Sequence, residues 1–129
     1  DGTVETLFTA PYVFPTGPLM DVYGVSGKAP TDGKFTPRGR SGVMTTAAVL
    51  AVHPHGSTLF PAVARGKAVR SSLLCTELPP PPMASNFAPP PNAAMLTEQE
   101  LNRRHRDDPS CASCHTLLEP IGFSLDMYD

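Results

Sequence analysis

The stretch Asp108-Pro109-Ser110-Cys111-Ala112-Ser113-Cys114-His115 decides how this chain of 129 residues is interpreted. Asp108 suits the N-cap of a helix, and Pro109 suits the first helical position, where its missing N–H has no helical partner. We therefore predict a helix over about 109–118. It should end before Pro120, because proline disfavours helical backbone at the residue that precedes it.

Two cysteines and a histidine share one face of this helix, since Cys111, Cys114 and His115 stand at i, i+3 and i+4. Cys-x-x-Cys-His is the pattern that attaches a haem covalently in c-type cytochromes. The two thiols bond to the porphyrin, and the imidazole reaches its iron. The motif therefore predicts haem c held by Cys111 and Cys114, with His115 as an axial ligand.

The same residues permit other chemistry: a Cys111–Cys114 disulfide, a Cys/His half-site for zinc, or a thioredoxin-like redox pair. Zinc usually takes four protein ligands, and the only further cysteine is Cys75. A thioredoxin-like pair lies near a strand–helix–strand pattern, which this segment does not show. We favour haem attachment over these three alternatives.

Histidines are our candidates for a sixth iron ligand. We expect His105, His55 or His53 rather than one of the five methionines, which mostly lie in apolar or proline-flanked stretches suited to packing. His105 has the alternative of a propionate contact or a helix-end position. For His53 and His55 the alternative is a position in a solvent-exposed turn. Two histidine ligands would give a lower reduction potential than His/Met.

Composition predicts a loop-rich chain: 16 prolines and 10 glycines stand beside only 7% aromatic residues, so the apolar core is modest. A bound haem would enlarge it. The fold class that we expect is mainly α, a small cytochrome c-like helical domain with long proline-rich irregular segments. The proline runs 78–82 and 89–91 are interpreted as semi-rigid spacers.

Further helices are expected along the chain. A capping box at 97–100 predicts a helix through Arg106. Pro61 begins a predicted helix over 61–74. A short helix is expected over 18–24, and the apolar segment 45–52 fits a helix or a strand. The apolar stripe of the helix over 61–74 comprises Ala62, Gly66, Val69 and Leu73.

We divide the chain into three parts: 1–24, the tail end of a preceding domain; 25–96, a helical and proline-rich segment that wraps the haem region; and 97–129, the haem-binding helices. Arg65 is expected to make a surface ion pair, with a haem propionate as its alternative partner. Cys75 is expected to be a buried free thiol or to bridge to a part of the protein outside this chain.

Charge and hydropathy limit the partners. The net charge is −2 with 17% charged residues, so there is no basic footprint for nucleic acid. No stretch approaches the roughly 18 apolar residues of a membrane span. Because the chain begins at Asp1 without Met, we expect a mature or excised piece of a longer protein.

Several motifs together resemble the C-terminal, haem-bearing part of large exported proteins of planctomycetes and myxobacteria, known as planctomycete-type cytochromes c or as domains of unknown function. The resemblance covers 41–129 well, and the part before it resembles the end of the preceding domain in those proteins. It implies export to the periplasm or outside the cell, haem c on Cys111 and Cys114, and ligation by His115. The runs that carry the resemblance are 40–45, 61–70, 74–75 with the prolines after it, 105–115 and 119–126.

Two positions depart from the pattern of that family. It usually has Asp where Glu119 stands, and Ser-Pro where this chain has Phe60-Pro61. The second departure removes a hydroxyl that would cap the helix starting at Pro61. Neither departure touches the haem motif.

The function that we predict is one-electron transfer by a c-type cytochrome domain, which makes it an electron carrier rather than a catalyst on its own. Its partner would be another redox protein or the remainder of a larger parent protein. The alternatives are a haem relay within a larger exported oxidoreductase or peroxidase-like enzyme, and a structural haem subunit of an assembly.

Overall fold

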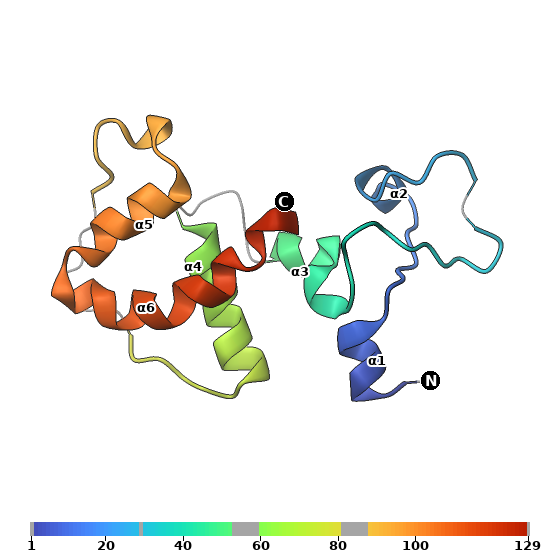
Figure 1. The fold of residues 1–129 in the computed structure, drawn as a ribbon, viewed down its shortest axis with the longest axis horizontal. Helices are drawn as coiled ribbons and strands as arrows, with labels where there is room; N and C mark the ends of the chain where they lie inside the picture. The colour runs from blue at the N-terminus through green and yellow to red at the C-terminus, as the bar shows by residue number, and fades with distance from the viewer. Residues whose placement is uncertain (1, 29, 53–59, 81–87, 129) are drawn as a thin grey trace. The chain divides into compact units, whose positions relative to one another are not determined.

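The computed structural model describes residues 2–28, 30–52, 60–80 and 88–128 (Figure 1). In these ranges the chain is helical without strands, apart from one isolated bridge between Val13 and Phe35, so the predicted mainly α class is confirmed. None of the helices described there has the length and apolar character needed to cross a bilayer.

Two compact units make up the chain: 1–52 with 128–129, and 53–127. The three segments that we divided by sequence, 1–24, 25–96 and 97–129, remain predictions.

The first unit consists of short helices. Two expectations concern them: the short helix within 18–24 is confirmed, and the segment 45–52 is helical rather than extended over most of its length. The phenolic oxygen of Tyr23 accepts a hydrogen bond of 2.8 Å from the backbone N–H of Ala47, at the start of the last helix. The helices are α1 (Val4–Thr9), α2 (Leu19–Val22), the 3-10 turn η1 (Val43–Thr45) and α3 (Ala47–Val52).

The second unit carries the motif. Its helices are α4 (Pro61–Ala68), the π-helical turn η2 (Val69–Leu73), the 3-10 turn η3 (Ala93–Met95), α5 (Glu98–Arg106) and α6 (Pro109–Phe123). The 3-10 turn η4 (Asp126–Tyr128) follows and ends at the boundary with the first unit. The capping box is confirmed: the N–H of Glu100 donates to Thr97 Oγ1 (3.2 Å), and the N–H of Thr97 donates to Glu100 Oε2 (2.8 Å).

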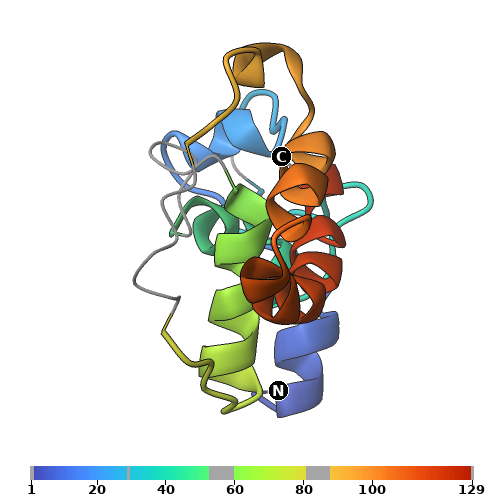
Figure 2. The same cartoon turned by 90° about the vertical axis from the view of Figure 1, so that its left-hand side faces the viewer.

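Helices α4 and α6 cross with their backbones in contact, and both views show α4 (green) beside α6 (red) (Figures 1 and 2). A Cβ atom added at Gly66 of α4 would overlap the carbonyl oxygen of Leu118. A Cβ atom added at Gly122 of α6 would overlap that of Ala62. The two glycines are therefore required by the close approach of the two helices.

The prediction that the motif helix ends near residue 118 is wrong, because α6 continues through Pro120 to Phe123. Its last turns are buried at Leu118, Glu119 and Gly122. Packing against α4 thus outweighs the local preference of the residue before a proline. Gly122 allows the helices to approach and does not form the turn expected there.

The end of the predicted helix over 61–74 also differs from expectation. Regular α-helix stops at Ala68, and a π turn follows, closed by a 3.1 Å bond from the N–H of Leu74 to the carbonyl of Val69. The π turn changes the helical register, so Leu73, expected in the apolar stripe, is 44% exposed. Cys75 follows with φ of 51° and is exposed, so the expectation of a buried thiol is wrong.

A residue far along the chain caps the start of α4. Phe60 occupies the N-cap and has no side-chain oxygen to offer. Glu98 of α5 supplies one: its Oε1 accepts a hydrogen bond of 2.7 Å from the N–H of Ala62. The missing capping hydroxyl is thus replaced by a carboxylate from another helix.

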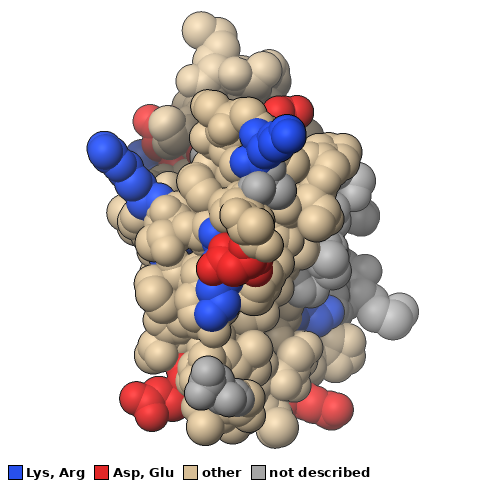
Figure 3. All heavy atoms as spheres, turned by 90° about the vertical axis from the view of Figure 1, so that its right-hand side faces the viewer, with Lys and Arg blue, Asp and Glu red and all other residues tan. Residues whose placement is uncertain are grey.

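Charged side chains of both signs lie among uncharged surface on the face shown in Figure 3. Among the described residues visible there, neither sign forms a continuous patch.

Candidate functional site

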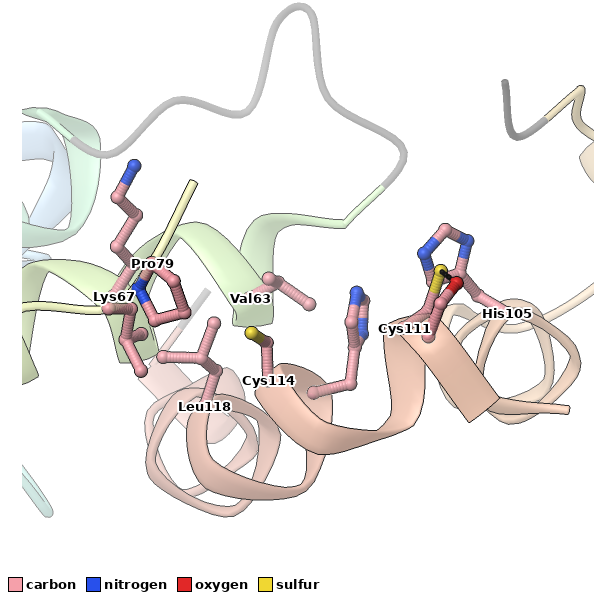
Figure 4. Close-up of a pocket in the computed structure, with 10 residues that line it drawn as sticks. Val63, Lys67, Pro79, His105, Cys111, Cys114 and Leu118 are labelled. Carbon is pink, nitrogen blue, oxygen red and sulfur yellow. Dashed lines mark hydrogen bonds between the residues drawn. The ribbon is translucent and has the colours of Figure 1, made fainter. Parts of the chain in front are cut away.

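A cavity of about 190 Å³ in the second unit brings the three motif side chains together. Cys111, Cys114 and His115 all line it, as the helical spacing predicted. Its other walls come from α4, from α5, from the rest of α6 and from the chain after η2. They comprise Val63, Lys67, Leu78, Pro79, His105, Ser110 and Leu118 (Figure 4).

Asp108 fixes the first turn of the motif helix. One oxygen, Oδ1, accepts hydrogen bonds from the N–H of Ser110 (2.9 Å) and from its hydroxyl (2.6 Å). These bonds stabilise the carboxylate and lower the pKa of Asp108 below its usual value. The predicted N-cap and Pro109 start are confirmed, and they set the direction of the side chain of Cys111.

The two thiols lie at different depths. Cys111 is buried, whereas Cys114 is partly exposed, and both line the cavity (Figure 4). Neither thiol takes part in a disulfide. No group of three or more His, Cys, Asp or Glu side chains in the described ranges is placed to hold a metal ion, so the zinc half-site finds no further ligands there.

Glu119 contacts the imidazole ring of His115. The Nδ1 of His115 lies 2.7 Å from Oε1 of Glu119, one helical turn later, and Arg106 Nη1 of α5 lies 2.8 Å from the other oxygen as an ion pair. Because a carboxylate only accepts hydrogen bonds, Nδ1 is the donor, so in the neutral imidazole the lone pair lies on Nε2. Nε2 is then the nitrogen available to a metal.

The role of Glu119 was missed in the sequence, where the residue appeared only as a departure from the family pattern. Its side chain is 1% exposed. The i, i+4 spacing from His115 is the signal that could have revealed the contact.

His105 is the one described candidate for the sixth ligand, and it lies in the same cavity. Its ring centroid is 4.5 Å from that of His115 and 5.3 Å from that of Phe60. Burial, and then the neighbouring His115, lower the pKa of His105 and favour the neutral imidazole that metals bind. Candidates His53 and His55 lie outside the described residues.

The structure differs from the sequence-based expectations for the first proline run and for Arg65. Leu78 and Pro79, the start of the first proline run, line the cavity, so this part of the run is more than a spacer. Arg65 is 2% exposed and forms an ion pair of 3.3 Å with Asp126, which is 33% exposed, so the expected surface ion pair is buried on the Arg65 side only. Arg65 is not among the described residues that line the cavity.

The chain belongs to the PSCyt3 family, described as proteins of unknown function (DUF1588), whose family model matches residues 40–129. This match covers the segment on which the resemblance was based, and the name PSCyt3 suggests a cytochrome. No curated protein matches the chain, and neither does any solved structure.

The chemistry of the residues that line the cavity suits a covalently attached haem, and the cavity of about 190 Å³ would have to widen to admit a porphyrin. Two free thiols and an imidazole line one space, and Val63, Leu78, Pro79 and Leu118 give that space apolar walls. Apolar walls suit the faces of a porphyrin, and the charged Lys67 at the far end of the cavity in Figure 4 suits its carboxylate edge.

Proposed function

We propose that this chain is a c-type cytochrome domain, with one haem attached to Cys111 and Cys114 and His115 as its axial ligand. The observation that carries the proposal is the convergence of two free thiols and the His115 imidazole on one largely apolar cavity. When bound, haem supplies one-electron chemistry between ferrous and ferric iron.

Attachment of the haem to the two thiols would be an addition reaction, in which neither the haem nor the protein loses an atom. Each sulfur forms a C–S bond with one carbon of a vinyl group, and the thiol hydrogen goes to the other carbon. The intact mass should therefore increase by the whole mass of one haem. Production in cells with a haem-attachment pathway, acid–acetone extraction and mass spectrometry would test this.

The three cysteines provide a matched series. Cys111→Ser and Cys114→Ser should each remove one thioether, and the double variant should release its haem to acid–acetone. Cys75→Ser, at an exposed position outside the cavity, should keep the haem. A wild-type protein with the mass of the bare polypeptide would contradict the proposal.

For the sixth position we propose a histidine, with His105 and His55 as candidates and His53 as a third. An iron between two imidazoles needs two metal–nitrogen bonds of about 2 Å each. Since the rings of His105 and His115 have centroids 4.5 Å apart, His105 would ligate only after its ring moves away. Single alanine changes at the three positions test the candidates, because only loss of the true ligand should convert low-spin iron to high spin.

Electron transfer is the activity that we propose, with a redox protein or the remainder of a longer parent protein as partner. We also propose that the protein is exported, since the family name suggests a cytochrome and c-type haem attachment takes place outside the cytoplasm. Spectra with and without dithionite test the activity: low-spin bands would support a carrier, whereas a high-spin form that binds cyanide or peroxide would favour the peroxidase-like alternative.

A further inference from the structure

We propose that Glu119 is the positioning residue of the axial histidine and holds the haem at a low reduction potential, with Arg106 limiting the effect. This inference rests on the proposed haem function, and it concerns residues that the haem motif does not include.

The geometry places a buried carboxylate beside the proposed ligand. Glu119 Oε1 lies 2.7 Å from His115 Nδ1, and the Glu119 side chain is 1% exposed, so water hardly screens it. The His115 side chain is itself 12% exposed. A carboxylate that accepts the Nδ1–H of a metal-bound histidine fixes the ring and makes the ligating nitrogen more basic.

A more basic ligand stabilises ferric iron more than ferrous iron, because the ferric ion carries the greater charge. The reduction potential should therefore fall when Glu119 accepts this hydrogen bond. Arg106 acts in the opposite direction: its Nη1 lies 2.8 Å from Oε2 and withdraws part of the negative charge. The side chain of Arg106 is 38% exposed, so solvent screens its influence and its effect should be the smaller one.

We therefore predict that substitutions of Glu119 and Arg106 shift the reduction potential in opposite directions. Glu119→Gln keeps a similar shape and an acceptor oxygen but removes the charge. It should shift the redox equilibrium toward ferrous iron by about tenfold, which for a one-electron couple is a rise of ~59 mV in midpoint potential. Arg106→Gln leaves the carboxylate without its cation and should lower the potential by less.

The experiment is a redox titration of the haem-loaded wild type and variants, followed by absorbance. Asp107→Asn is the matched control, since it removes one negative charge from an exposed position between the same two helices. It should change the potential by much less than Glu119→Gln does.

The outcomes separate this inference from the proposed function. A wild type without covalent haem would overturn both. Haem retained in Glu119→Gln with a potential shifted no further than in Asp107→Asn would overturn the role of Glu119 alone. If Glu119→Gln cannot hold haem, Arg106→Gln decides: a lower potential supports the inference, and an unchanged one refutes it.

Discussion

The α-carbon of Gly66 in α4 faces the carbonyl oxygen of Leu118 in α6 so closely that no side-chain atom fits between them. Alanine at position 66 would improve the intrinsic helix propensity by about 1 kcal/mol. The overlap with backbone should outweigh this gain, and we expect Gly66→Ala to lower the free energy of unfolding by about 1–3 kcal/mol. Urea unfolding measures it, with the exposed neighbour Lys67→Ala as control. A more stable Gly66→Ala would show that the helices do not meet here.

Gly122→Ala tests the reciprocal contact, with the carbonyl oxygen of Ala62. It should destabilise the protein by a similar amount, about 1–3 kcal/mol. Once one alanine has moved the helices apart, the second meets less resistance. The double variant should therefore be more stable than the sum of the two changes predicts, by about 0.5 kcal/mol or more. Simple additivity would mean that the two glycines respond to separate contacts.

Acid should weaken the start of the motif helix through Asp108. Its pKa is lowered in the folded protein by the bonds from the side chain and backbone of Ser110. The stability that it contributes is therefore present above its unfolded pKa and is lost as the pH falls through the lower, folded pKa. Asp108→Asn keeps an acceptor without a titrating charge and should lose this acid dependence in thermal unfolding. Asp107→Asn should keep it, and a wild-type profile in both variants would count against the cap.

Glu98 should show the opposite pH dependence. Burial raises its pKa, and the hydrogen bond from Ala62 offsets only part of this effect. The stability linked to Glu98 is therefore present below its unfolded pKa and is lost as the pH rises through the folded pKa. Glu98→Gln, which stays neutral and can still accept from Ala62, should gain stability relative to wild type between acid and neutral pH.

Loss of the acceptor itself is tested by Glu98→Ala. It should cost about 1 kcal/mol, as does the loss of other helix caps. Thermal unfolding at several pH values compares the two variants. If Glu98→Ala were as stable as Glu98→Gln at every pH, Glu98 would not act as the cap of α4.

Local signals in the sequence predicted the parts of the fold that neighbouring residues control. Asp108 and Pro109 start α6, and Thr97 with Glu100 starts α5, because the groups that bond there lie within three residues of one another. The same local reasoning ended α6 too early. The local rule for Pro120 takes no account of α4, which contacts the helix on both sides of that proline.

The candidate site was likewise predicted only in part. The spacing of Cys111, Cys114 and His115 was sufficient to bring them to one cavity. The contacts made by residues from other parts of the chain could not be predicted from local spacing. Arg106 reaches Glu119 from another helix, and Leu78 and Pro79 reach the cavity from beyond the π turn, which no local pattern predicted.

The hydrogen bond from Ala62 to Glu98 bears on the order in which the protein is made. The ribosome completes α4 before it adds the carboxylate that caps it, 36 residues later. A nascent chain that stops before Glu98 therefore leaves the first turn of α4 without this acceptor. The contact between Gly66 and Leu118 can form only after about 20 further residues have been added. The ribosome adds Leu118 after both motif cysteines, so α4 can dock on α6 only once the cysteines that would receive haem are already part of the chain.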